Sequence, residues 1–433
     1  MKEMYRKILY IFILMQPFID LATSLMTRFD IFFISLGTIV KGIFVLLMLI
    51  YLFFFNRSKY KRISIIYIIL LIIFYCGYLF TKPDVFMSFS AIFNEITSIF
   101  KYSYFPIFFI TTINFIDQYD IDRSKIIDLF TIDLFIYSIL IIIPSITNTG
   151  FNSYQNNEGY GIVGWFYSAN EISAIMTIIY PLLFINLDKK FNVKDYVMIV
   201  STIVAIIMIG TKTPFYGMLI ITFILAIYYL FNVNKKTKQF IFIVLILLFT
   251  IFFKTYIPAN INYEKRVECQ NDYYNEKTTN EKDNSKLECQ VAEGQKVALL
   301  SGRDVLLKQS FKMYRDSKIV DKFFGIGFTN RNSINNGEFS KLVEMDFFDI
   351  LFRFGIIGFV LYMLPVFVII LKVAISFIKN LPNLNVEKII YSYGSAIGIG
   401  IGFLVGHVFG SPAVGFYLAP ITAFTLGIFD KKM

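Results

Sequence analysis

Long apolar segments recur along the chain and alternate with short polar ones. About 20 apolar residues are needed for a helix to cross a hydrocarbon core of about 30 Å. Such segments must satisfy their own backbone hydrogen bonds, which predicts helices, and none has the alternation of an outer-membrane barrel. The pattern predicts an all-α polytopic membrane protein with about twelve transmembrane helices. The expected spans lie near residues 7–27, 32–55, 63–80, 90–115, 126–146, 166–186, 195–211, 214–233, 239–257, 347–373, 388–408 and 411–428.

One polar block interrupts this pattern between the ninth and tenth expected spans. It runs from Asn260 to Val343 and is rich in Lys, Arg, Asp, Glu and Asn. An acidic cluster, Glu344-Met345-Asp346-Phe347-Phe348-Asp349, follows at the start of the next apolar segment. We therefore expect nine spans in 1–257, one large loop in 258–346, and three spans in 347–433.

The distribution of basic residues predicts the orientation. With alternating spans, the basic clusters fall on one side, and Lys and Arg collect in loops that stay in the cytoplasm. Both termini are then cytoplasmic and the polar block is extracytoplasmic; the acidic loop 117–125 fits least well. The net charge of +10 follows from these loops, so we expect a lipid bilayer and not nucleic acid as the partner. The clusters are Lys2 with Arg6 and Lys7, residues 57–62, Lys189 with Lys190 and Lys194, Lys235 with Lys236 and Lys238, Lys379 with Lys388, and Lys431 with Lys432.

Cysteine and histidine are scarce in the block. Cys269 and Cys289 both lie in it, and on the outer side they could close a small hairpin as a disulfide or remain free thiols. The block contains no His, so we expect no metal site there.

Several charges fall inside apolar segments, where they are costly and indicate function by default. Asp20 and Lys41 lie on neighbouring spans, so an internal ion pair would explain both. Glu95 and Lys101 form no recognisable relay. The eleventh expected span carries a glycine at every fourth residue from Gly394 to Gly410, which favours close helix packing. The single His407 lies on the same span, and we expect it to be a hydrogen-bonded packing residue.

The outward ends of the spans carry candidate binding residues. Trp165 suits an interfacial aromatic belt. Asn170 and Glu171 lie inside the expected span, near its outward end, and are candidates for substrate binding. Lys212 lies in a tight outward turn, where it could extend to the interface or hold a phosphate.

The block itself offers an anion site. The stretch Ser301-Gly302-Arg303-Asp304 has the pattern of a helix start, and the helix would reach about Ser317. Arg303 would then lie in the first turn beside free N–H groups, a combination that suits an anion. Arg331 follows the turn Gly325-Ile326-Gly327, which lacks the spacing of a nucleotide-binding motif.

The acidic cluster has two interpretations. Acids in a first helical turn are favoured by the helix dipole, and Arg353 would pair with Asp349 one turn away. Alternatively, Glu344 or Asp346 would be a general base beside the cationic residues. The three acids are too close in sequence, with no second ligand group, to predict a divalent ion.

With these motifs in place, the chain resembles the O-antigen ligase and polysaccharide polymerase (Wzy-type) membrane proteins over most of its length. The order and sidedness of the motifs carry the resemblance. They are the Gly–aromatic stretch 164–170 ending in Asn, Lys212 between two spans, Gly302-Arg303 in a long loop, Gly325 with Gly327, and a polar cluster followed by a span around 354–358.

The resemblance implies a fold related to membrane-embedded, GT-C-like glycosyltransferases and a glycan donor carried on undecaprenyl diphosphate. Ligases have His-Asn where this chain has Glu344-Met345-Asp346, and Lys212 replaces their usual Arg. A carboxylate can be the base where His would be, so the role can survive, although these departures put the acceptor in doubt.

The expected function is therefore a cell-membrane polysaccharide polymerase that needs no cofactor or metal. Glu344 or Asp346 would be the base; Arg303, Lys212 and Arg331 would bind the diphosphate; Trp165, Asn170, Glu171 and Arg353 would contact substrate. A flippase and a chain-length regulator are possible partners. Alternatives are ligase-like transfer of a finished glycan to a lipid, wall or protein acceptor, a polysaccharide flippase or transporter, and a sensor or scaffold.

Overall fold

The computed structural model describes residues 2–31, 35–119, 121–154, 159–189, 192–279, 303–329, 343–380 and 384–429. These residues are predominantly helical and form no strand, only an isolated bridge between Asn152 and Ile162. The helices are α1 (Lys2–Arg28), α2 (Leu36–Ile50), η1 (Tyr51–Phe55), α3 (Lys61–Phe80), η2 (Pro83–Met87), α4 (Phe89–Tyr119), α5 (Arg123–Ile146), α6 (Ala169–Ile179), η4 (Tyr180–Leu182), α7 (Leu183–Lys189), α8 (Val193–Ile209), α9 (Lys212–Phe231), α10 (Val233–Phe252), η5 (Lys254–Tyr256), α11 (Pro258–Thr279), α13 (Arg303–Asp316), α14 (Ile319–Phe324), α16 (Asp346–Lys379), α17 (Val386–Leu404) and α18 (Pro412–Phe429).

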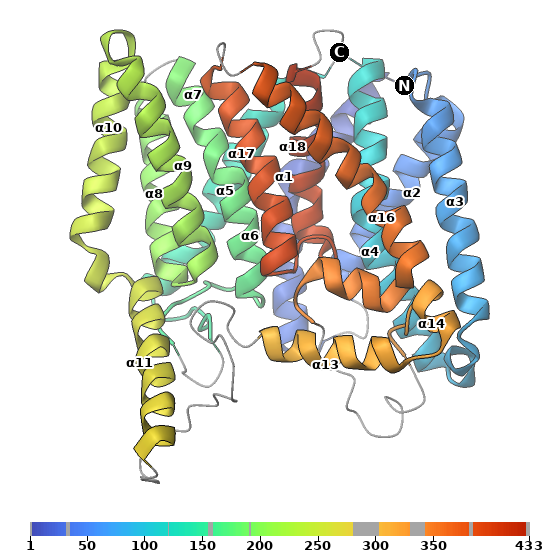
Figure 1. Ribbon diagram of the computed structural model, residues 1–433. Coiled ribbons are helices and arrows are strands. Elements are labelled where there is room, and N and C mark those ends of the chain that lie inside the picture. The colour runs from blue at the N-terminus through green and yellow to red at the C-terminus, as the bar shows by residue number, and fades with distance from the viewer. Residues whose placement is uncertain are drawn as a thin grey trace.

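Each expected span corresponds to a helix or to consecutive helical segments. Among the described residues, eight helices are long and apolar enough to cross a membrane. The other expected spans correspond to α8, α10, α17 and α18, which run alongside those eight in the bundle (Figure 1). The all-helical, multi-pass character is therefore confirmed, whereas twelve crossings stay a prediction.

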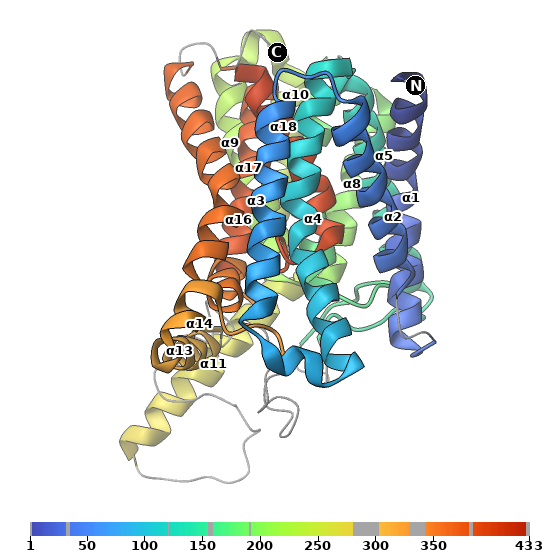
Figure 2. The ribbon, with the colours of Figure 1, turned by 90° about the vertical axis from the view of Figure 1, so that its right-hand side faces the viewer.

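The two ends of the bundle differ. Helix α1 begins and α18 ends at one face, and α11, α13 and α14 lie at the opposite face (Figure 1; Figure 2). This separates the ends of the chain from the polar block, as the alternation of spans predicted. Which face is cytoplasmic stays a prediction.

A kink in α16 lets this helix start along one face and then cross the bundle (Figure 1). Gly355 has φ of 68°, which breaks the regular hydrogen-bond ladder and frees carbonyl groups before it. The carbonyls of Phe352 and Arg353 accept hydrogen bonds from the backbone N–H of Ile326 and Gly327, at 2.8 and 3.2 Å. The predicted glycine turn is thus bound to the kink and satisfies its backbone.

The glycine row packs as expected only along α17. A Cβ on Gly394 would contact Ile421 at 3.2 Å, and one on Gly398 would overlap Leu418 at 2.5 Å, so α18 lies close against this side. The helix ends at Leu404, before Gly406 and His407. The expectation that His407 lies on this helix is wrong, because the chain has turned into a loop there.

Polar pairs occupy the interior of the bundle. Lys41 donates to Asp20 at 2.7 Å with both side chains buried, which confirms the expected ion pair. Tyr137 donates to the second carboxylate oxygen of Asp20 at 2.6 Å. Glu95 is fully buried and accepts hydrogen bonds from the Tyr78 hydroxyl and, at 3.2 Å, from the N–H of Phe328. Glu95 therefore helps to hold the segment after the glycine turn.

Candidate functional site

The acidic segment before α16 is locked against the loop between α17 and α18. Glu344 has φ of 56° and His407 φ of 60°, a left-handed conformation that is uncommon for residues other than glycine. Gly406, with φ of 82°, packs so closely that a Cβ there would lie 1.7 Å from the Glu344 carbonyl oxygen. Such strained backbone gathers at functional sites, where the surrounding structure must hold it.

The Asp346 side chain stabilises the strained loop around His407. Its carboxylate accepts hydrogen bonds from three consecutive backbone N–H groups, those of His407 at 3.0 Å and of Val408 and Phe409 at 2.7 Å each. The side chain is buried, so these donors replace the water that an ionised carboxylate requires. Asp346 therefore fixes the loop that carries His407.

Asp349, one turn into α16, connects this helix to α4. It accepts a hydrogen bond from the Tyr102 hydroxyl of α4 and forms an ion pair with Arg353 at 3.4 Å, which confirms the expected pair. Arg353 also donates to the Gly327 carbonyl at 2.9 Å. Arg353 thus holds both Asp349 and the glycine turn in place. It does not line the cavity described in the next paragraph.

An acidic cavity of about 230 Å³ lies between these elements. We call it the acidic cavity. Four carboxylates contribute to its wall, together with one lysine and the histidine, and aromatic and hydroxyl groups complete it. The lining residues are Ser98, Lys101, Tyr102, Glu171, Phe328, Glu344, Asp346, Asp349, His407, Gly410, Ser411 and Pro412.

A cationic cluster, formed by Lys212, Arg266 and Arg303, lies beside Glu344. The Nε of Arg303 is 3.1 Å from Oε2 of Glu344, with side-chain exposures of 12% and 33%. Burial lowers the pKa of Arg303, Glu344 opposes this effect, and Arg266 lowers the pKa further. Lys212 lies near enough to both arginines to be repelled by them. An anion bound among these groups would relieve that repulsion.

The cluster is assembled by a close approach of two backbone segments. Gly161 and Gly210 both have positive φ, and a Cβ on Gly161 would lie 2.1 Å from the carbonyl oxygen of Ile209. Asn262 of α11 then joins the parts, because it exchanges hydrogen bonds with the backbone of Tyr160 at 2.6 and 2.8 Å and donates to the Gly210 carbonyl at 3.0 Å. This junction carries Lys212 on one side and Arg266 on the other.

Aromatic rings cover the cluster. The Nζ of Lys212 lies 5.3 Å from the centre of the Tyr263 ring, and the Cζ of Arg266 lies 5.5 Å from that of Tyr154. Burial raises the pKa of Tyr154, while Arg266 and Arg303 lower it, so both arginines lie near this phenol. These rings give the cationic site apolar walls.

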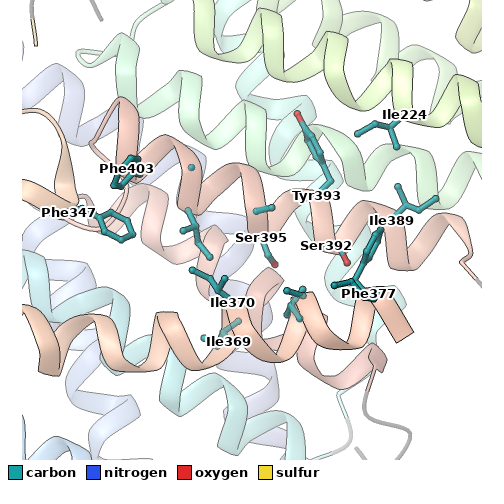
Figure 3. A pocket seen from close by; sticks show the side chains of 16 residues that line it. Ile224, Phe347, Ile369, Ile370, Phe377, Ile389, Ser392, Tyr393, Ser395 and Phe403 are labelled. Carbon is teal, nitrogen blue, oxygen red and sulfur yellow. The ribbon is translucent and has the colours of Figure 1, made fainter. Parts of the chain in front are cut away.

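An apolar groove of about 700 Å³ runs between α16 and α17 and reaches α9 (Figure 3). We call it the apolar groove. It extends from Phe377 and Ile389 at one end to Phe347 and Phe403 at the other. Phe347 directly follows Asp346, so the groove ends beside the acidic cavity. Phe403 is 43% exposed, which leaves this end accessible from the side of the bundle.

The other predicted site residues are distributed unevenly. Glu171 lines the acidic cavity, whereas Asn170 and Trp165 do not. Trp165 instead donates from its indole to Thr149 at 3.2 Å. Arg331 and Cys289 lie outside the described residues, as does the Ser301-Gly302 pair before α13, and the side chain of Cys269 is not described.

Sequence reasoning missed several residues of the site. Arg266 and Tyr154 were not singled out, Lys101 was given no role, and His407 was assigned to packing. The available signals were a basic residue soon after Pro258 and a lysine inside an apolar span. The contacts of Tyr154 and Tyr160 with α11 depend on long-range folding, so no local pattern reveals Tyr154.

The fold and the site together define a multi-pass helical membrane protein with a charged cavity at one face and an apolar groove that leads to it. The model of the O-antigen ligase like membrane protein family matches residues 2–431, and the chain belongs to that family. This confirms the resemblance and supports a membrane enzyme of glycan transfer. A sequence comparison with curated proteins finds no match.

Proposed function

We propose that the protein is a polymerase of cell-surface polysaccharide that transfers glycan from undecaprenyl diphosphate to a hydroxyl of a lipid-linked repeat unit at the outer face of the membrane. The observation that carries this proposal is the contact between Glu344 and Arg303, which joins the acidic cavity to the cationic cluster. A base and an anion site are then adjacent, as displacement of a diphosphate by a hydroxyl requires.

The proposed step is a single displacement at the anomeric carbon of the donor. The acceptor oxygen forms a bond to that carbon while the bond from the carbon to the diphosphate oxygen breaks. The acceptor proton passes to the Glu344 carboxylate, and the electron pair leaves on undecaprenyl diphosphate. Residues of this chain supply the base and the cations, and we expect no metal or cofactor to be needed.

Glu344 is a better candidate base than Asp346. The Glu344 side chain is one-third exposed and lines the acidic cavity. Asp346 is buried and already accepts three backbone hydrogen bonds, so we assign it to positioning the His407 loop. Asp349, held by Tyr102 and Arg353, would support the same wall.

The cationic cluster would bind the diphosphate. Arg303 can offer a planar pair of donors to phosphate oxygens, while Lys212 acts as a point charge. Arg266 joins the residues proposed from the sequence, because the structure brings it near both. Arg331 remains a candidate for the same role, and Asn170, Glu171 and Trp165 remain candidates for contacts with sugar.

The apolar groove would hold the polyprenyl tail of the donor. Its walls are almost wholly hydrocarbon and aromatic, and its outer end at Phe347 lies next to the acidic cavity. A long hydrocarbon chain can be buried there while its headgroup reaches polar residues, as expected of an amphiphilic substrate in a bilayer.

Ligase-like transfer is the nearest alternative, since the family description itself names ligases. A flippase is an alternative of another class. The test is to give purified protein lipid-linked repeat units in detergent and to measure glycan length. Glycans longer than the input unit support polymerisation. A parallel reaction contains an added lipid, wall or protein acceptor, and transfer only to that acceptor supports ligation. Unchanged units in both reactions contradict an enzyme of either kind. In cells, a flippase would deliver the units, and a chain-length regulator would set the product size.

A further inference from the structure

A second polar cavity adjoins the acidic cavity and has different chemistry. It encloses about 210 Å³ between α1, α2, α4, α6 and the start of α18. Serine and threonine are the largest class among its lining residues, and we call it the hydroxyl-lined cavity. Five of them come from the end of α1 and the start of α2: Thr23, Ser24, Thr27, Ser35 and Thr38.

Some of these hydroxyl groups already have partners in the protein: Thr23 Oγ1 accepts from the Gly37 N–H at 2.9 Å, and Ser35 Oγ lies 2.9 Å from Thr38 Oγ1. Thr23 and Ser24 donate to carbonyls of their own helix, those of Ile19 and Asp20, at 2.7 Å each. A hydroxyl has one proton and two lone pairs, so an oxygen whose proton is committed in this way still accepts from a ligand. Polyhydroxylated molecules bring many such donors, which fits the wall of this cavity.

Charged groups lie where the two cavities meet. Lys101, Glu171, Ser411 and Pro412 line both of them. Within the part of the chain that the structure describes, neither Lys101 nor Glu171 forms an ion pair. Unpaired charges inside membrane spans are costly and persist where they bind a ligand or water. A ligand that passes from one cavity to the other would contact both side chains.

The positions of the cationic cluster and the hydroxyl-lined cavity relative to Glu344 indicate which substrate each of them binds. Arg303 contacts Glu344 from the cationic cluster, whereas Lys101 and Glu171 connect the Glu344 cavity to the hydroxyl-lined cavity. In a displacement, the nucleophile approaches the face opposite the leaving group. If the diphosphate leaves into the cationic cluster, the attacking hydroxyl arrives from the acidic cavity and the rest of its molecule extends into the hydroxyl-lined cavity.

We infer that the hydroxyl-lined cavity is the acceptor subsite and binds a saccharide whose terminal hydroxyl reaches Glu344. This inference rests on the proposed function for its direction of attack. It assigns Ser24 and Thr38 to recognition of acceptor sugar hydroxyls, and Lys101 and Glu171 to the passage between the cavities.

The kinetic test separates donor from acceptor. The acceptor probe is the repeat unit released from its lipid and converted to an O-alkyl glycoside, which cannot donate. The donor probe is the lipid-linked unit with its acceptor hydroxyl methylated, so that it cannot accept. Ser24→Ala and Thr38→Val should each raise the KM for the acceptor roughly 2- to 10-fold, the loss of one hydrogen bond, and leave the donor KM within about twofold.

Ser145→Ala is the matched control. Like Ser24, Ser145 is partly buried and donates to the carbonyl four residues earlier at 2.7 Å, but it lines neither cavity. Its acceptor KM should not change. A rise in the donor KM alone for the cavity variants would mean that donor sugar occupies the cavity; no rise in either KM would mean that no saccharide binds there. Either result overturns the inference.

A binding measurement distinguishes failure here from failure of the proposed function. Saturation-transfer NMR of the O-alkyl glycoside should detect binding to the full chain and to Glu344→Gln, because neither requires turnover. Ser24→Met, which fills the cavity, should abolish the signal, while its melting temperature checks folding. Binding lost in Ser24→Met by a protein that never elongates glycan would sustain the cavity assignment and refute the polymerase. Binding kept in Ser24→Met would refute the cavity assignment.

Discussion

The guanidinium Nε of Arg303 lies 3.1 Å from the carboxylate of Glu344, and this contact joins α13 to the strained segment that precedes α16. The ion pair constrains both side chains. The arginine places its positive charge beside the carboxylate, and the carboxylate holds the arginine at the edge of the cationic cluster. A guanidinium has five N–H donors, more than one carboxylate can accept, so it can hold a second anion as well.

Replacing Glu344 with glutamine should stop transfer and leave the fold intact. The amide keeps the size of the side chain but cannot take a proton, so turnover should fall at least about 100-fold. Glycan length from lipid-linked units measures the effect. Normal polymer from this variant would remove Glu344 from the mechanism.

Asp346→Asn provides the contrast for the same assay. The amide has one acceptor oxygen for the loop donors that now bind a carboxylate, so we expect a loss of about 1–3 kcal/mol of stability, seen as a lower melting temperature. A variant that melts normally and is inactive would instead move the base to Asp346.

Arg303→Lys should impair turnover although the charge is kept. Lysine cannot present two planar donors to a phosphate, so we expect kcat to fall about tenfold or more. Arg315→Lys is the control, because Arg315 is on the same helix and 64% exposed. If both variants retain full activity, the diphosphate does not depend on a guanidinium at position 303.

The helices could be predicted from the sequence because a bilayer imposes one rule on every span. Apolar length indicated the elements, and the capping pattern before Arg303 predicted a helix to about Ser317 where α13 ends at Asp316. The Asp20–Lys41 and Asp349–Arg353 pairs were also predictable, since neighbouring spans or helical spacing brought the partners together.

The assembly of the site could not be predicted in the same way. The glycine row favoured a helix through Gly410, but three N–H groups after Gly406 bind Asp346, and this long-range contact accompanies the end of the helix at Leu404. His407 therefore lines a cavity. Arg266 likewise reaches the cationic cluster through the Asn262 junction between distant segments.

Gly406→Ala should be far more damaging than an alanine at Gly400 of α17. The new Cβ would overlap the Glu344 carbonyl at 1.7 Å, and φ of 82° adds a cost of about 1–2 kcal/mol. We expect loss of both activity and thermal stability. Gly400→Ala is the control because a Cβ at Gly400 meets nothing within 4 Å, and full activity of Gly406→Ala would contradict the lock between the two loops.

A side chain that fills the apolar groove should raise the KM more for a donor with a long prenyl tail than for a donor with a short one. Gly400 lines the groove and has open space around it, so Gly400→Leu places an apolar side chain there without a clash at its Cβ. The KM should rise several-fold for a donor with the full polyprenyl tail and less for one with a short prenyl tail, with Gly400→Ala as the reference. An equal effect on both donors would mean that the tail lies elsewhere.

The orientation can be tested by labelling single cysteines introduced at each face. With the native cysteines changed to serine, Lys312→Cys on α13 and Lys235→Cys at the start of α10 are both exposed and lie at opposite faces of the bundle. Basic loops stay in the cytoplasm, so a membrane-impermeant maleimide should label position 312 in intact cells and position 235 only after permeabilisation. The reverse pattern would place the acidic cavity and the cationic cluster on the cytoplasmic side. Transfer to a lipid-linked acceptor at the outer face would then be impossible, whatever the activity of the purified protein.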